Sequence, residues 1–316
     1  MGIQWYPGHM AKARRIVSGS AALADVILEV LDARIPYSSR NPEVDAILGQ
    51  RPRIIVLNKA DLADPAATEA WTEHLRSLGW LAGPADATSG RGVRAIISSA
   101  RALMAKRWAE QDAQALVDRK TLRKRFVKVL VVGIPNVGKS SLINRLGGEY
   151  SARVGGLPGL TRGKQWVRAS KDLSLLDVPG ILWAKFEEPD VGYKLAMVGA
   201  IRQEVLDPEP IAGRVLSFLL QRSAEVLQER YDLRRKPATW EEGLDAIGRR
   251  RGYLMSGGRI DRYKASILLL QEFREGQLGR FTLEPVEQFG DRFAPNPIRP
   301  APDVPEPGPG GSEEQP

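Results

Sequence analysis

The residues with the clearest chemical potential lie near the middle of the chain, where residues 133–140 read G-I-P-N-V-G-K-S. This is the G-x-x-x-x-G-K-S spacing of a phosphate-binding loop, or P-loop. Its backbone N–H groups curl around phosphate oxygens, and the N-terminus of the next helix adds a partial positive charge. Lys139 is expected to reach the β- and γ-phosphates, and the hydroxyl of Ser140 to ligate Mg²⁺. The spacing therefore predicts a site for a nucleoside triphosphate and magnesium.

The elements that must position a P-loop flank these residues on both sides. The apolar run at residues 126–132 predicts a buried parallel strand. After the loop, residues 142–146 have the spacing of a helix. Strand, loop and helix in this order are the context in which the motif binds phosphate.

A second loop carries residues that read the base. Residues 53–57 are apolar and β-branched, which predicts a strand, and N-K-A-D follows at Asn58 to Asp61. N-K-x-D at the end of a strand is the guanine-reading element of GTPases. The carboxylate of Asp61 would accept from N1–H and the N2 amine of guanine. Adenine offers no such pair of donors and would leave the carboxylate unpaired. A further loop at residues 86–89 falls where GTPases place a second base contact.

Two segments have the properties of switch regions, which respond to the γ-phosphate. Residues 148–163 are rich in glycine, and Thr161 near their end is expected to close over Mg²⁺. Asp177 to Gly180 form D-x-x-G at the end of a predicted strand. Asp177 is expected to hold Mg²⁺ through water, and the N–H of Gly180 to sense the γ-phosphate.

The residues after D-x-x-G lack the usual means of orienting the attacking water. Many small GTPases place a glutamine there, whereas this chain has Ile181 and Leu182. An aliphatic side chain cannot hydrogen-bond to water. Either hydrolysis is very slow, or another group enters the site.

The order of the motifs is unusual, because N-K-x-D precedes the P-loop, whereas in ordinary GTPases it follows. This order indicates a circular permutation. In this respect the chain resembles the circularly permuted GTPases of the RbgA (YlqF) type, over roughly residues 1–290. The matching segments are Trp5 to Ala13, Asp32 to Pro36, Asn58 to Asp61, Gly133 to Ser140, Pro158 to Thr161 and Asp177 to Trp183.

The resemblance implies a function and two further site residues. Members of this family assist late assembly of the bacterial large ribosomal subunit. His9, in a Pro-Gly-His-Met loop before a basic helix, is the family's candidate replacement for the missing glutamine. From the residues alone, a lone loop histidine is also compatible with a purely structural role. Asn136 resembles the asparagine that binds K⁺ in potassium-activated GTPases.

These arguments define the expected site. The residues expected to contact GTP are Asn58, Lys59, Ala60, Asp61, Asp86, Ala87, Asn136, Val137, Gly138, Lys139, Ser140, Ser141, Thr161 and Gly180. The expected Mg²⁺ ligands are Ser140, Thr161 and Asp177, with Asn136 as a K⁺ ligand. The expected catalytic residues are Lys139 and, as a candidate, His9.

The alternation of strands and helices predicts an α/β fold with a doubly wound, mostly parallel sheet. We expect this GTPase domain to span residues 1–205 and a stiff Asp-Pro-Glu-Pro linker to follow it. Apolar residues at helical spacing then predict a small all-α domain over residues 206–290. Residues 291–316 are rich in proline and glycine and are expected to be disordered.

The charge of the chain favours a polyanionic partner. Its net charge is +8, and 27% of its residues are charged. The candidates for RNA contact are Arg234, Arg235, Lys236, Arg249, Arg250 and Arg251. A basic run at residues 119–125 is either a solvated linker or a phosphate-contacting arm. Charge that serves only solubility is the alternative interpretation.

Three functions compete at this stage. The first is a GTPase that acts as an assembly switch on the precursor of the large subunit and its rRNA. The second is a GTP-gated RNA-binding scaffold in which hydrolysis is incidental. The third, a metabolic P-loop kinase, is disfavoured because N-K-x-D and D-x-x-G specify a switch. The chain has no cysteine and no apolar run of membrane-spanning length, so we expect a cytoplasmic protein. We also expect it to be a monomer away from the ribosome.

Overall fold

The computed structural model describes residues 7–114, 126–151, 165–170, 172–183, 186, 188–201 and 206–293. These residues form two compact units: residues 7–183 with 282–293 make the first, and 186–281 make the second. The division therefore falls near residue 184, not at the expected boundary after 205. The reason is that α6 (Pro189–Met197) packs with the helices of the second unit, where Arg274 donates hydrogen bonds to its last carbonyls.

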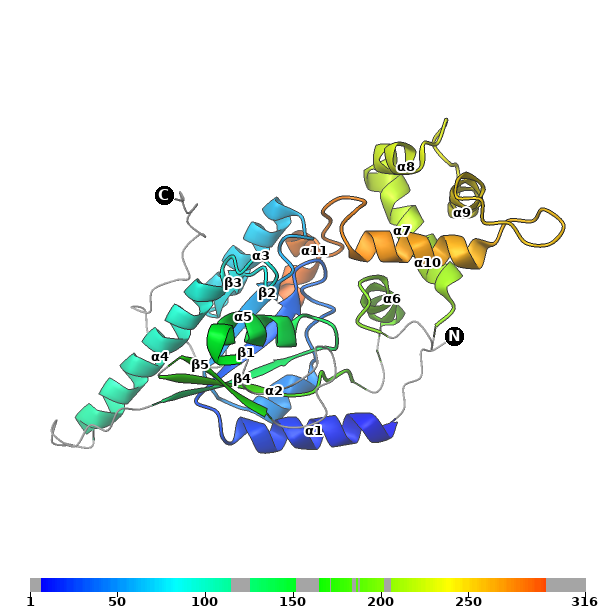
Figure 1. Ribbon diagram of the computed structural model, residues 1–316. Helices are drawn as coiled ribbons and strands as arrows, with labels where there is room; N and C mark the ends of the chain where they lie inside the picture. The colour runs from blue at the N-terminus through cyan, green and yellow to red at the C-terminus, as the bar shows by residue number, and fades with distance from the viewer. Residues whose placement is uncertain are drawn as a thin grey trace. The chain divides into compact units, whose positions relative to one another are not determined.

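The first unit is built on a sheet in which the described strands follow the order β3-β2-β1-β4-β6-β5 (Figure 1). Only β5, at the edge, is antiparallel to its neighbour among these strands. The α/β fold with a mostly parallel sheet is thus confirmed. The strands are β1 (Val26–Asp32), β2 (Arg53–Asn58), β3 (Leu81–Pro84), β4 (Val127–Gly133), β5 (Gln165–Ser170) and β6 (Leu173–Asp177).

The register of the parallel strands brings the motifs to one edge of the sheet. Asp32 at the end of β1 is opposite Asn58 at the end of β2, and Val30 is opposite Gly133 at the end of β4. On the other side of β4, β6 ends at Asp177. The N-K-x-D loop, the P-loop and D-x-x-G therefore all leave the sheet at its carboxyl edge, where α/β sheets bind ligands.

Helices cover both faces of the sheet, with α1 and α2 on one side and α5 on the other (Figure 1). Buried Ala13 and Val17 of α1 pack into an apolar cluster that includes Ile181. The helix begins at Pro7, so His9 lies in its first turn and not in the expected loop. The helices of this unit are α1 (Pro7–Ala21), α2 (Glu43–Leu48), α3 (Pro65–Ser77), α4 (Val93–Gln114), α5 (Lys139–Ser151), α11 (Val286–Phe289) and the 3-10 helix η3 (Gly290–Arg292).

The chain returns to the first unit after the helical one, through residues 282–293, which we call the return segment. The carboxylate of Glu284 is fully buried and accepts from the N–H and the hydroxyl of Ser38. The indole N–H of Trp71 donates to the carbonyl of Glu284, and the ring of Phe293 packs against Trp71. The expectation that disorder starts at residue 291 was therefore wrong for residues 291–293, because apolar contacts hold them; residues 294–316 lie outside the described chain.

The second unit is helical, as expected, with α7 at its centre. The expected Asp-Pro-Glu-Pro linker is instead the start of α7, because Asp207 caps the helix by accepting from the N–H of Glu209 and Pro208 occupies its first turn. The other helices here are α6, α8 (Ala224–Tyr231), α9 (Trp240–Arg250) and α10 (Arg262–Arg274). None of the helices in the described part of the chain has the length and apolar character needed to cross a membrane.

Candidate nucleotide-binding site

The P-loop holds its lysine in a desolvated position. The ammonium group of Lys139 donates to the carbonyl oxygens of Ile134 at 2.8 Å and Gly133 at 3.2 Å. Burial lowers the pKa of Lys139 to about 8. A phosphate group nearby would favour the charged form of this lysine, because opposite charges raise the pKa of an amine. The loop is therefore built to gain from an anionic ligand.

Two glycines in these loops are required by close approach. Gly138 has a φ of +97°, and a Cβ there would lie 2.3 Å from Nδ2 of Asn58. At Gly180, a Cβ would lie 2.5 Å from the backbone nitrogen of Pro135 in the P-loop. Any larger residue at either position would push the neighbouring loop away. D-x-x-G and the P-loop are thus in direct contact.

The structure brings two of the three expected magnesium ligands together. The hydroxyl of Ser140 donates to Oδ2 of Asp177 at 3.1 Å. Ser140 is the second residue of α5 and Asp177 ends β6, and they meet because β4 and β6 are neighbours in the sheet. Hydroxyl and carboxylate oxygens are hard donors of the kind that Mg²⁺ prefers. Thr161, the third expected ligand, lies outside the described residues.

Asn58 connects the three loops that surround the expected nucleotide. Its Nδ2 donates to the carbonyl of Val137 in the P-loop at 2.8 Å. Its Oδ1 accepts from the N–H of Ala87, in the second base loop, at 3.1 Å. Asn58 is almost fully buried. Its role in this structure is therefore to hold the loops in register.

Asp61 and Asp86 were both expected to contact GTP, but the structure places them differently. Asp61 is half-buried, and no other described residue hydrogen-bonds to its carboxylate. The carboxylate of Asp86 instead accepts from the N–H groups of Thr88 at 2.8 Å and Ser89 at 3.1 Å. Although burial opposes it, this hydrogen bonding lowers the pKa of Asp86. Asp86 therefore braces its own loop, whereas Asp61 has the open geometry of a base-reading group.

The residues after D-x-x-G are buried. Ile181 is 3% exposed, its N–H donates to the carbonyl of Gly133, and its carbonyl accepts from Asn41. Its side chain belongs to the apolar cluster beneath α1. The sequence-based expectation that this position does not orient water agrees with its burial.

For the remaining expected residues, the structure gives backbone conformation and burial. Asn136 is exposed and has a φ of +56°, while Val137 is buried and Ser141 exposed. The side chain of His9 and the basic run at 119–125 lie outside the described residues.

Sequence reasoning missed one residue next to this site. Asp32 was noted only as part of the Asp-Ala-Arg motif, with no role. In the structure its carboxylate lies 3.0 Å from the ammonium group of Lys59 in N-K-x-D. A signal was available, since Asp32 ends the strand between those of the two nucleotide loops.

The sheet order and the three converging loops define a P-loop GTPase domain whose guanine-reading strand precedes the P-loop strand in the chain. A family model described as 50S ribosome-binding GTPase matches residues 128–226. Ribosome biogenesis GTPase A of Bacillus cereus is 44% identical, over 92% of this chain and 97% of that protein. The chain belongs to the ribosome biogenesis GTPase A family, and it is a GTPase.

Two solved structures share the fold. GNP-bound YlqF from T. maritima matches with a TM-score of 0.59 and 26% identity. The match covers 88% of this chain and 99% of the YlqF chain. A structure described as GDP-bound TM YlqF matches with the same TM-score of 0.59 and 25% identity, over 86% of this chain and 99% of its own. The resemblance found from the motifs is thereby confirmed.

Proposed function

We propose that this protein is a GTP-dependent assembly factor that binds precursors of the large ribosomal subunit, contacts their rRNA and hydrolyses GTP in response. The observation that carries the nucleotide part is the convergence of three loops on Asn58, with Asp61 left open for the base. Membership of a family of ribosome biogenesis GTPases supports the ribosomal part.

Magnesium is the cofactor that the donor set fits. Ser140 and Asp177 would hold it together with Thr161, and the ion would neutralise charge on the β- and γ-phosphates. Lys139 would add a second positive charge from the P-loop. Asn136, exposed at the tip of the loop, would bind K⁺ and so supply charge that an arginine finger supplies elsewhere.

Water orientation is the step that the residue after D-x-x-G does not provide. Ile181 is buried and apolar, so a group from another element is needed. His9 is our candidate, because it lies in the first turn of α1, one turn before Ala13, and Ala13 packs in the same cluster as Ile181. An imidazole is the side chain best suited to proton transfer near neutral pH.

RNA contact is proposed for one end of the helical unit. The segment between α9 and α10, residues 251–261, forms a hairpin-like tip closed by a hydrogen bond from the N–H of Asp261 to the carbonyl of Tyr253. Six large apolar side chains are exposed in the described chain, and three of them lie at or beside this tip: Leu254, Met255 and Tyr263. Tyr263, on the first turn of α10, is 55% exposed.

Arginines surround these exposed apolar groups. Arg249 and Arg259 are exposed at the two sides of the tip. Arginine beside exposed apolar and aromatic groups suits RNA, because arginine contacts phosphate and flat side chains stack on unpaired bases. Some candidate arginines have acidic partners within the unit: Arg250 pairs with Asp232, and Arg235 with Glu242. We therefore assign the main contact to Arg249, Arg259 and the tip.

The chain offers a direct route from nucleotide to RNA-binding unit. D-x-x-G ends at Gly180, and the helical unit starts within a few residues of it. Ordering of this switch by the γ-phosphate would therefore act on the chain that enters the helical unit.

A second function is favoured by one observation. The buried Ile181 is also what a GTP-gated scaffold would show if hydrolysis were incidental. Sedimentation with large subunits, in GDP and in a non-hydrolysable GTP analogue, tests binding, and the hydrolysis rate with and without subunits separates the two functions. Binding that depends on the analogue together with a stimulated rate supports an assembly GTPase. Binding without stimulation supports the scaffold, and no binding in either state contradicts both.

A further inference from the structure

The Asp-Ala-Arg motif at the end of β1 has no role in the function described so far. Asp32 is 1% exposed, and its Oδ2 lies 3.0 Å from the ammonium group of Lys59. Lys59 follows Asn58 in N-K-x-D and has a left-handed φ of +59°. This backbone conformation is rare for a residue with a side chain, and it accompanies the contact of Lys59 with the neighbouring strand end.

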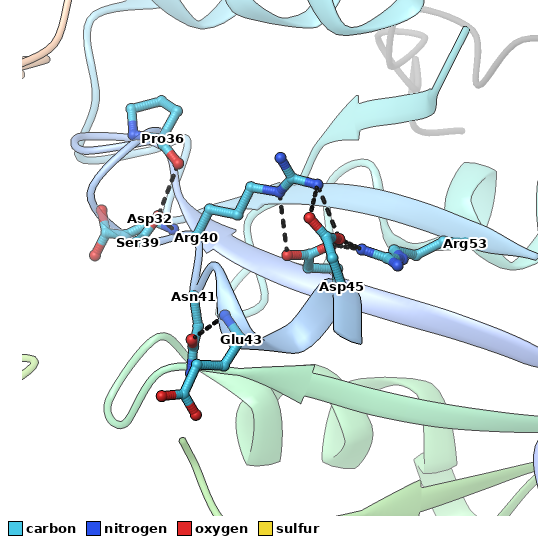
Figure 2. Close-up of polar contacts among 9 residues, drawn as sticks. Asp32, Pro36, Ser39, Arg40, Asn41, Glu43, Asp45 and Arg53 are labelled. Atoms are coloured by element: carbon cyan, nitrogen blue, oxygen red, sulfur yellow. Dashed lines mark hydrogen bonds and ion pairs between the residues drawn. The ribbon is translucent and has the colours of Figure 1, made fainter. Parts of the chain in front are cut away.

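Asp32 is itself fixed in one orientation. Arg34 donates to both carboxylate oxygens at 2.9 Å, and its backbone N–H donates to Oδ1 at 3.1 Å. The backbone N–H of Asp32 donates to the hydroxyl of Ser39 at 3.0 Å, and Figure 2 shows the two residues side by side. Burial opposes ionisation, yet the charges of Arg34 and Lys59 hold the pKa of Asp32 far below its usual range. The carboxylate is thus a fixed anion.

The place of Asp32 in the sheet gives this anion a function. β1 lies between β2, which ends in N-K-x-D, and β4, which ends in the P-loop. A lysine can lay its aliphatic stem along a flat apolar surface while its ammonium group is held elsewhere. With its ammonium group on Asp32, at the end of the strand between the two loops, the stem of Lys59 would be positioned to cover one face of the guanine ring.

We propose that Asp32 is a positioning residue for the guanine base, which acts by holding Lys59 in its nucleotide-contacting conformation. This inference rests on the proposed role of Lys59 in GTP binding. The opposing view is that Asp32 only closes the loop at residues 33–41 through Arg34, so that its removal would affect folding alone.

A double-mutant cycle distinguishes these views. The dissociation constant for a fluorescent GDP derivative is measured for the full-length parent, Lys59→Met, Asp32→Asn and the double variant. We expect Lys59→Met to raise it about ten- to a hundredfold, as for removal of a charged hydrogen-bonding group. Asp32→Asn should raise the dissociation constant about tenfold in the parent but less than about twofold in the Lys59→Met background. The reason is that the effects of two residues that act through one contact are not additive.

The hydrolysis kinetics give an independent readout. KM for GTP should rise in Asp32→Asn while kcat at saturation stays unchanged, because the ion pair lies on the base side of the site and not at the γ-phosphate. If Asp32→Asn does not fold, Asp32→Glu keeps the charge for Arg34 but moves the carboxylate by one methylene. The same cycle is then run with that variant.

Glu29 provides a matched control on the same strand. It is equally buried and pairs with Arg53 at 3.0 Å, in the cluster of Arg40, Asp45 and Arg53 drawn in Figure 2. Glu29→Gln should lower the melting temperature without changing the dissociation constant. Effects of Asp32 and Lys59 that add would overturn the inference, and so would an equal loss of affinity in Glu29→Gln. An unaltered dissociation constant in Lys59→Met would instead refute the proposed role of Lys59.

Discussion

The side-chain amide of Asn58 donates a 2.8 Å hydrogen bond to the carbonyl of Val137, and so ties the base-reading loop to the phosphate-binding loop. The oxygen of the same amide accepts a hydrogen bond from the backbone N–H of Ala87. Each of these atoms thus makes one hydrogen bond within the protein, whereas no other described residue hydrogen-bonds to the carboxylate of Asp61. We therefore propose that Asn58 stabilises the site and that Asp61 selects the nucleotide.

Asp61→Asn is expected to shift preference from GTP toward xanthosine triphosphate. The carboxylate accepts from donors on guanine, whereas an amide can donate to the extra carbonyl of xanthine. Competition titration with both nucleotides measures the shift. Asn58→Ala serves as control, since it should weaken both nucleotides equally. An unchanged GTP affinity in Asp61→Asn would show that this loop does not read the base.

Replacement of Arg249 and Arg259 together by glutamine should flatten the salt dependence of binding to large subunits. Removing one phosphate-binding arginine is expected to reduce the slope of log K against log salt by about one. Sedimentation at several salt concentrations gives this slope. As a contrast, Leu254→Ala with Met255→Ala should weaken binding at every salt concentration and leave the slope unchanged. An identical slope in the arginine variant and the parent would exclude phosphate binding by this end of the unit.

His9→Ala should abolish most of the stimulation of GTP hydrolysis by the large subunit. We expect a loss of about 100-fold, or about 3 kcal/mol of barrier, as for a positioned proton-transfer group. Affinity for GTP should hardly change, because the imidazole would meet the attacking water. Single-turnover hydrolysis with saturating subunits measures the effect. His74, the other histidine of the chain, lies on α3 beside Trp71, so His74→Ala is the control. A parental rate in subunit-bound His9→Ala would assign the water to rRNA or to a bound cation.

Glu284→Ala should destabilise the GTPase unit, although it lies far from the nucleotide motifs in sequence. The substitution removes the fully buried partner of the Ser38 N–H and hydroxyl, at a cost of about 2 kcal/mol or more for the donors left unpaired. Denaturant unfolding followed by tryptophan fluorescence reports the change, because Trp71 contacts the return segment. Glu287, which is exposed on the same segment, supplies the control variant Glu287→Ala. Equal stabilities of the two variants would mean that the return segment is not a structural part of the unit.

The differences between expectation and structure have a common cause. Sequence patterns correctly placed the strands that lead into the P-loop, N-K-x-D and D-x-x-G, because periodicity and turn residues act over a few neighbouring positions. They did not show that the carboxylate of Asp86 accepts hydrogen bonds within its own loop, or that His9 lies in the first turn of a helix rather than in a loop. A carboxylate has the same identity whether it meets a ligand or a nearby amide, and only the folded backbone decides between the two.

The sequence by itself determined the local chemistry of this protein: a P-loop suited to phosphate, an Asp61 suited to guanine, and an aliphatic residue where a water-orienting glutamine would be. These follow from spacing within single loops, which covalent geometry constrains. Only the tertiary structure decided the partners across loops: Asn58 with Val137, Asp32 with Lys59, and Ser38 with Glu284. Such pairs depend on strand register and on where a returning chain packs, and these are set by the burial of the whole core rather than by any one segment.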